Sequence, residues 1–172
     1  MSVYDNIKPE KVNEIKGRVE TDSALMDDVV NGIIQPYVKD LDNYVLFIKD
    51  ILKDGENPPT NAELDDFSLN LATYIYFAGG MCEQLGIRDD ISKAVYKEMY
   101  HSQRASIDKG TISDKDSLAE LASQQEYLVS VCYNRAYKTV KSKVENAQEL
   151  LSAVKKVIGR RMQEMELTRM GN

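Results

Sequence analysis

The chain has 172 residues, of which 42% are hydrophobic and 29% charged, and its formal net charge is −6 at pH 7. These are ordinary values for a soluble globular domain that is long enough to bury a core. No apolar run approaches twenty residues, which excludes a transmembrane helix. The first residues, MSVYDNIKPEKVNEIK, lack the apolar segment of a signal peptide, so we expect a cytoplasmic protein without a membrane partner.

Charge is unevenly distributed along the chain. Residues 1–86 contain 7 Lys and Arg against 16 Asp and Glu, a net charge of −9. Residues 87–172 contain 15 against 12, a net charge of +3. This asymmetry favours either self-association, in which the opposed halves meet, or a polyanion-binding half beside an acidic half.

Helical signals begin early in the chain. Pro9 at a first turn predicts a helix that ends near Glu20. Asp22 or Ser23 can begin the next one, and Pro36 is expected to kink or end it. The apolar residues that follow recur at steps of three and four, which is the helical period.

The stretch KDGENPPTNAELDD is the clearest loop. Gly55 can end one helix, the two prolines that follow block its continuation, and Thr60 or Asn61 can begin the next. Gly79 and Gly80 lie inside that next helix, where glycine is costly, and we expect another backbone to approach closely there.

Glycines and capping residues divide the middle of the chain. Gly86 is expected to end one helix, and Asp89 or Asp90 to begin another that ends at Gly110. Capping-box patterns then start at Ser113 and Ser117.

The C-terminal part predicts one long amphipathic helix. Between Leu118 and Met165 there is no proline, and the apolar positions recur about every 3.6 residues. The fold class is therefore all-α, with about five helices in a single helical domain over residues 1–172. Residues 1–110 form an acidic helical-bundle portion, and residues 111–172 form the long C-terminal helix. A chain of this size cannot sheathe such a helix, so we expect a bundle or coiled coil within a homo-oligomer.

Residues 133–161 carry eight Lys or Arg and only two Glu. On a helical wheel, the cations opposite the apolar stripe form what we call the basic face: Arg135, Lys138, Lys141, Lys156 and Arg160. Glu145 and Glu149 divide this face into two clusters, whereas Lys143 and Arg161 flank the apolar stripe. The face is either ordinary solvated surface with pairs such as Lys141–Glu145, or a surface for phosphates or an acidic partner.

Other residue types give no sign of catalysis. His101 is the only histidine, and the chain has no Walker loop, GxGxxG or HExxH motif, so we expect no catalytic residue, metal or small-molecule cofactor. Three acidic pairs fall at predicted helix starts, where the helix dipole favours them: Asp27–Asp28, Asp65–Asp66 and Asp89–Asp90.

Four tyrosines could have either of two roles, whereas one state is expected for the two cysteines. Tyr96, Tyr100, Tyr133 and Tyr137 lie near basic residues and either stack on single-stranded bases or rim a core with the hydroxyl in water. Cys82 and Cys132 lie among apolar residues, and both are expected to be free, buried thiols.

Three segments resemble the UvsY-type recombination mediators of tailed phages, small helical oligomers that help load a recombinase onto single-stranded DNA. They are IKGRVETDSALMDD, KEMYHSQRASIDKG and the long stretch from DKDSLAELASQQEYL to VKKVIGRR. The resemblance covers about half of the chain by scattered positions, and the low pI (≈ 4.9) and the AGGMCEQLG segment depart from the family pattern. It implies a non-enzymatic accessory protein of phage DNA recombination or replication, in the host cytosol. Such a protein would bind single-stranded DNA or a DNA-metabolism protein such as the recombinase.

Two other functions remain open from the sequence. The first is an oligomeric structural or interaction protein, such as a virion or anti-defence component, whose acidic half docks a basic protein. The second is an enzyme with a carboxylate-held metal, which would need Asp65, Asp66 and Glu83 to converge.

Overall fold

The computed structural model describes residues 8–53 and 57–170, and these form four α-helices with no strand among them. The helices are α1 (Pro9–Lys53), α2 (Asn61–Ser106), α3 (Ile112–Ala122) and α4 (Gln124–Met170). The all-α prediction and the long C-terminal helix are confirmed, with four helices in place of about five. No helix of the described part is long and apolar enough to cross a bilayer.

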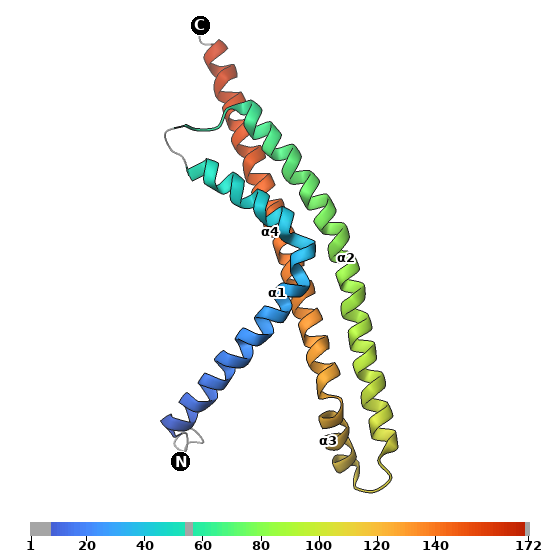
Figure 1. Cartoon of the computed structure of the whole chain (residues 1–172). Coiled ribbons are helices and arrows are strands. Elements are labelled where there is room, and N and C mark those ends of the chain that lie inside the picture. The colour runs from blue at the N-terminus through green and yellow to red at the C-terminus, as the bar shows by residue number, and fades with distance from the viewer. Residues whose placement is uncertain (1–7, 54–56, 171–172) are drawn as a thin grey trace.

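The helices form an elongated, open bundle. α2 and α4 run antiparallel along one another and make its spine (Figure 1). The second part of α1 packs on both of them, and α3 folds back beside the far end of α2. The molecule therefore has a three-helix end and an end where α2 and α4 pair with only the short α3 beside them.

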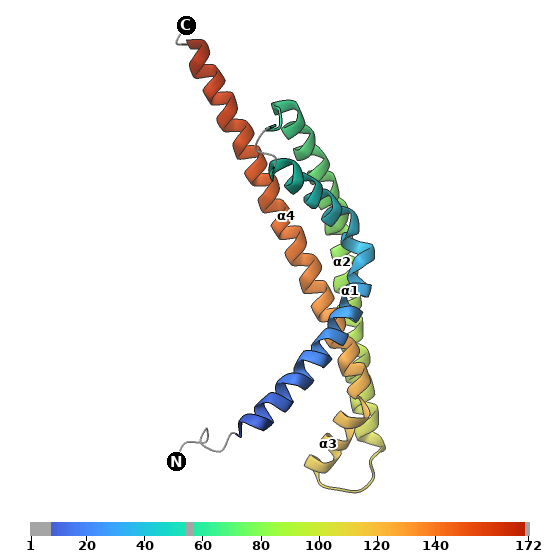
Figure 2. The same cartoon turned by 60° about the vertical axis from the view of Figure 1, so that its left-hand side comes forward.

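The first part of α1 leaves this bundle and projects away from it in both views (Figure 2). We call residues 9–29 the arm, because the first buried residue of α1 is Val30. All of the arm is exposed except Met26, which is half-buried.

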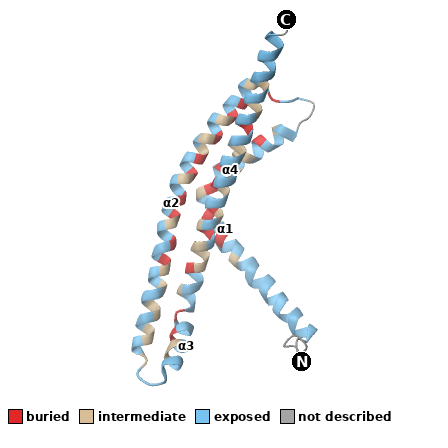
Figure 3. Cartoon of the chain, turned by 180° about the vertical axis from the view of Figure 1, so that it is seen from behind, coloured by how far each residue is buried: buried red, intermediate tan, exposed pale blue. Residues whose placement is uncertain are grey.

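The core lies along the line where α1, α2 and α4 face each other (Figure 3). Its largest fully buried apolar side chains come from these three helices: Val38, Ile48, Leu64, Leu71, Leu85 and Val140. Aromatic pairs join α1 to α2: Tyr44 and Tyr74 meet in a tilted arrangement with ring centroids 4.9 Å apart, and Phe47 and Phe67 meet edge to face with centroids 5.9 Å apart. Each large apolar side chain buried in this way contributes roughly 1.5–3 kcal/mol of transfer free energy.

α1 is one continuous helix, so the predicted break near Glu20 and restart at Asp22 or Ser23 are wrong. Capping residues begin a helix only where the previous one stops, and no proline lies between Pro9 and Pro36 to stop it. Pro36 lies inside α1, and the helix changes direction in its light-blue part (Figure 1). The missing N–H and the ring clash of a helical proline account for this bend, so the kink expected at Pro36 is confirmed.

α2 also runs through its predicted end. The terminus expected at Gly86 and the helix start expected at Asp89 or Asp90 are wrong, because all three residues lie well inside α2. Gly86 lies against a side chain of α4: a Cβ added there would be 3.2 Å from Cε2 of Tyr137. The glycine is thus explained by an aromatic ring packed across it.

Gly79 and Gly80 do not mark a close approach. A Cβ added to either would have no atom within 4 Å, so the close packing expected there is wrong. The buried face of α2 passes through Ala78 and Cys82 instead, and the two glycines lie beside it.

The long C-terminal helix is shorter than predicted, because Ser123 separates α3 from α4. The Ser123 N–H and hydroxyl both donate to the carbonyl oxygen of Ala119, at 3.0 and 2.8 Å. A serine hydroxyl that bonds the carbonyl four residues earlier slightly destabilises a helix and often bends it.

The start of α3 also differs from the prediction. Its capping box joins Thr111 to Asp114, and not the pairs that begin at Ser113 or Ser117. Gly110 does not end α2, which stops at Ser106, but it supplies the left-handed turn (φ 118°) that precedes α3.

Replacing Thr60 by alanine is expected to lower the free energy of unfolding by about 1 kcal/mol. Thr60, one of the two residues predicted to begin this helix, is the N-cap of α2. Its Oγ1 accepts the Glu63 N–H at 3.3 Å, and the Glu63 carboxylate accepts the Thr60 N–H at 2.7 Å. Gly55, expected to end the preceding helix, lies outside the described residues. Urea unfolding measures the loss, with the exposed mid-helix change Thr73→Ala as control. Equal effects of the two changes would contradict the capping role.

The Thr60 cap also gives a pH dependence. Hydrogen bonds from the backbone and side chain of Thr60 lower the pKa of Glu63 below its ordinary value of 4.5. A carboxyl group with a lowered pKa contributes stability above its unfolded pKa and loses it as the pH falls through the folded pKa. The difference between wild type and Thr60→Ala should therefore be smaller at about pH 3 than at about pH 7.

Candidate partner-binding surface

The basic face lies on the outer side of α4. Its five cations (Arg135, Lys138, Lys141, Lys156 and Arg160) are all exposed, as the helical wheel predicted. The buried residues of the same helix lie on the opposite side, where α4 packs against α1 and α2. From Lys138 to Lys156 the face extends about 27 Å along the helix axis. It is therefore an elongated surface and not a pocket.

The two cations predicted to flank the apolar stripe have structural contacts instead. Lys143 Nζ donates to both carboxylate oxygens of Asp42 on α1, each at 2.8 Å. Arg161 donates to the carbonyl oxygen of Pro59 at 2.6 Å and to Asn61 Oδ1 at 3.4 Å. These contacts tie α4 to α1 and to the start of α2, which leaves the basic face as the cationic surface without such ties.

Direct ion pairing leaves most of the basic face unneutralised. Of its five cations, only Arg160 lies within 4.0 Å of a carboxylate oxygen of another described residue, that of Glu164 at 3.8 Å. The pair expected between Lys141 and Glu145 does not form in the structure of the described residues. Glu145 and Glu149 are exposed between the two clusters and lower the potential at the middle of the face.

The tyrosines do not form one platform beside this surface. Tyr96 contacts Tyr100 and Tyr127, with ring centroids 6.4 and 5.4 Å apart, where α2 meets the start of α4. Tyr133 and Tyr137 are half-buried and pack against the core. The structure thus favours the core-rimming reading for the latter pair.

The structure gives no support to the metal-site alternative. No group of three or more His, Cys, Asp or Glu side chains in the described part of the chain can hold a metal ion. Asp65, Asp66 and Glu83 are each exposed, and His101 is exposed with its ring against Tyr100.

The acidic pairs and the cysteines can also be placed. Only the pair at residues 65–66 lies near a helix start, because the pairs at 27–28 and 89–90 lie inside α1 and α2. The prediction that all three mark helix starts is therefore wrong. Cys82 is buried and Cys132 half-buried, and both are free. Burial raises the pKa of the Cys82 thiol, which disfavours the reactive thiolate.

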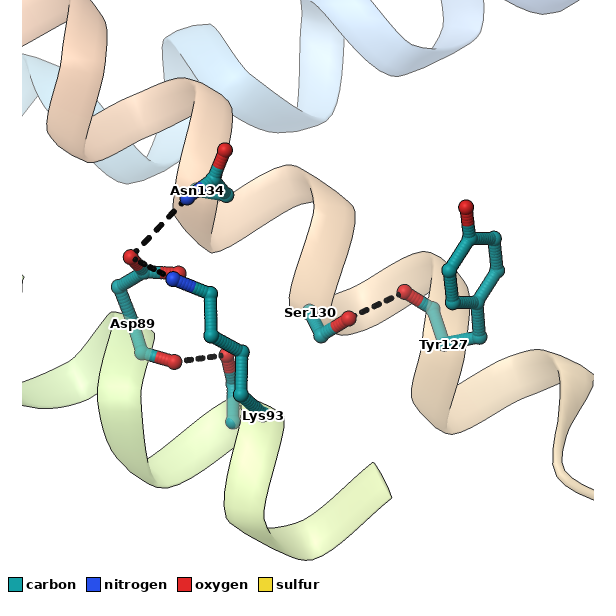
Figure 4. A network of polar contacts seen from close by, with 6 residues as sticks. Asp89, Lys93, Tyr127, Ser130 and Asn134 are labelled. Atoms are coloured by element: carbon teal, nitrogen blue, oxygen red, sulfur yellow. Dashed lines mark hydrogen bonds and ion pairs between the residues drawn. The ribbon is translucent and has the colours of Figure 1, made fainter. Parts of the chain in front are cut away.

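Sequence reasoning missed a buried polar contact between α2 and α4. The Asp89 carboxylate is only 5% exposed, and its Oδ2 accepts from Lys93 Nζ at 2.6 Å and from Asn134 Nδ2 at 3.1 Å (Figure 4). Nearby, the Ser130 hydroxyl donates to the carbonyl oxygen of Tyr127 at 2.7 Å. One signal was available: Asp89 follows Cys82 and Leu85 at the spacing of the buried stripe.

Comparison of the chain with protein-family models, with curated proteins and with solved structures found no match. Geometry and charge are therefore the basis for a functional proposal.

Proposed function

We propose that the protein is a non-enzymatic accessory protein of phage DNA recombination or replication that binds single-stranded DNA through the basic face of α4. The observation that carries this proposal is that all five cations of the face are exposed while Lys143 and Arg161 are held in inter-helix contacts. The resemblance to UvsY-type mediators suggests single-stranded DNA, among the possible polyanions, and suggests a recombinase as a second partner.

The expected contacts are with the phosphate backbone. Lysine and arginine side chains on one straight helix can follow a strand of phosphates, and such contacts carry no sequence information. Each cation that neutralises a phosphate releases a counterion, so affinity falls steeply as salt rises. The two clusters, divided by Glu145 and Glu149, would each hold a separate stretch of the strand.

We further propose that the protein acts as a homo-oligomer. Its accessible surface is 12886 Å², whereas a compact monomer of 19.5 kDa exposes about 8,500 Å². The excess of roughly 4,000 Å² per chain is more than the roughly 1,000–2,500 Å² that each partner buries in a typical obligate homodimer, so the chain has ample surface for subunit contacts. Several basic faces in one particle would also bind one strand by avidity, which offsets the overall net charge of −6.

The acidic first half favours a second candidate function, docking of a basic protein. Exposed carboxylates with no ion pair to another residue of the described ranges occur along α1 and the start of α2, at Asp27, Asp28, Asp40, Asp50, Asp65 and Asp66. In this case the protein is an oligomeric structural or interaction component, and its basic face meets acidic residues of a neighbouring copy.

Titration of labelled single-stranded DNA at about 50 and about 200 mM salt tests the DNA-binding proposal. If all five cations contact phosphates, affinity should fall about 100-fold between the two conditions. Absence of binding at the lower salt concentration would exclude the proposal.

Paired charge reversals then locate the surface. Lys138→Glu with Lys156→Glu should abolish DNA binding without changing the oligomer mass. The control makes the same charge change on α1, Lys39→Glu with Lys49→Glu, and both of those lysines are also exposed. Equal losses in the two variants would mean that net charge matters and the basic face does not. Dissociation of the oligomer by the first pair would make the face a subunit interface.

A further inference from the structure

The arm presents an apolar seam that no other described part of the chain covers, apart from Met26 at its bundle end, which packs partly against the core. We define this seam as the residues that recur at steps of three and four along one side of the arm: Val12, Ile15, Val19, Met26 and Val29. Val12 is 46% exposed, Ile15 54%, Val19 57% and Val29 52%. Asp22 occupies the one remaining position of the series. A repeat of this spacing is typical of helices that pack on other helices.

An arm in this position needs a partner. A helix in a folded protein owes most of its stability to packing of its apolar face, and a single helix in water is marginal. The bundle fully buries residues of α1 only from Val30 onward, and Met26 is the one arm residue that packs partly against the core. The seam would otherwise leave four large apolar side chains in water.

An apolar groove lies between α2 and α4 where α1 is absent. It has a volume of about 400 Å³, and its apolar lining includes Ile91, Val95 and Val129, which are 57%, 47% and 51% exposed. Arg88 lines one end of this groove, and its guanidinium donates to the hydroxyl of Tyr37 on α1. The groove therefore begins at the place where α1 is already packed on α2.

The groove continues the site that α1 occupies at the three-helix end. A straight α1 would extend from Tyr37 into it, but α1 bends at its middle and the arm leaves the bundle (Figures 1 and 2). The residues that line the groove run from Arg88 to Val95 on α2 and from Gln125 to Tyr133 on α4, about 11–12 Å along the helix axes, which is room for about two turns of a further helix. A helix of the same kind as the arm is thus the occupant that would complete a three-helix bundle along α2 and α4.

We propose that the arm of a second copy of this chain fills this groove, with its seam on Ile91, Val95 and Val129. Exchange of one helix between copies is a familiar route to homo-oligomers, because the same contacts serve in every copy. The inference rests on the homo-oligomer proposed above and identifies its interface. The excess accessible surface supplies the area that this interface needs.

Charge substitutions on either side of the interface should dissociate the particle. Val19→Glu in the seam and Val95→Glu in the groove are each expected to give monomers at about 10 µM by sedimentation or light scattering, since each buries a charge in an apolar contact. Thr21→Glu, on the opposite side of the arm, is the matched control and should leave the mass unchanged. Helical circular dichroism confirms that each variant stays folded. Wild-type mass in both test variants would overturn the interface.

Cross-linking of mixed chains identifies what covers the groove. Both natural cysteines are first replaced, as Cys82→Ala and Cys132→Ala, in a variant that keeps the wild-type oligomer mass. In this background, chains that carry Val19→Cys are mixed with chains that carry Val95→Cys and a different tag. The mixture is then oxidised. A disulfide between the two tags supports the proposal. Disulfides between two Val19→Cys chains only would mean that arm packs on arm. A double variant that cross-links only within one chain would mean that the arm closes on its own groove. Either of the last two results would overturn the proposal.

Different results would exclude the exchanged arm and the proposed functions. A wild-type protein that is monomeric in solution would exclude the homo-oligomer and the exchanged arm together, but not DNA binding. An oligomer that survives both charge substitutions would exclude the exchanged arm alone.

Discussion

Replacing Leu71 by alanine is expected to lower the free energy of unfolding by about 3 kcal/mol. Leu71 has no exposed surface and lies at the centre of the α2 stripe, one turn from the buried Phe67 and Ile75. Removing its side chain loses the transfer free energy of the deleted groups and leaves a cavity between three long helices, which relax only partly.

The same helix provides a control for Leu71. Leu69 lies two residues earlier and is 69% exposed, so Leu69→Ala should change the free energy of unfolding by less than about 0.5 kcal/mol. Denaturant unfolding followed by circular dichroism measures both variants. If the two changes cost the same, the helix α2 is rotated relative to the packing described above.

Helical period predicted the fold class but not the ends of the helices. Apolar residues at steps of three and four identify the faces that α1, α2 and α4 bury, because burial repeats with the turn of the helix. Helix ends depend on single residues whose effect is set by their surroundings. Gly86 can end a helix in isolation, yet here the ring of Tyr137 packs across it and α2 continues.

The division of the α4 cations was also predictable from the sequence. The helical wheel separated Lys143 and Arg161 from the five residues of the basic face, and the structure gives those two cations inter-helix partners. Which partners they have was not predictable, since Asp42 and Pro59 are about one hundred residues away in the chain. The bend of α1 and the groove it leaves open likewise depend on how three helices pack together.

The sequence did not reveal the buried carboxylate of Asp89, because one helix was predicted to end at Gly86 and the next to begin at Asp89 or Asp90. With a helix start expected at Asp89, its acid had an ordinary role at a first turn. Once α2 is continuous, Asp89 falls in the buried stripe, where a charge is costly unless it is paired. An acidic residue at a core position of a long helix is therefore a signal of a polar contact with a neighbouring helix.

Replacing Asp89 by alanine is expected to lower the free energy of unfolding by about 2 kcal/mol, because Asn134 loses its partner inside the α2–α4 contact. Lys93 is 44% exposed and can return to water, which keeps the loss below that of a fully buried ion pair. Asp90→Ala is the matched control, since Asp90 is exposed, and should cost under about 0.5 kcal/mol.

A double-mutant cycle isolates the contact between Asp89 and Asn134. If their hydrogen bond stabilises the fold, the free-energy changes of Asp89→Ala and Asn134→Ala should fail to add by about 1 kcal/mol when combined. Additive changes would mean that the two side chains act independently. Because the contact lies where α2 and α4 continue without α1, a measurable coupling would show that this end of the spine is held by its own polar contact. The groove beside it would then be an ordered surface, ready to accept a helix, rather than a fraying end.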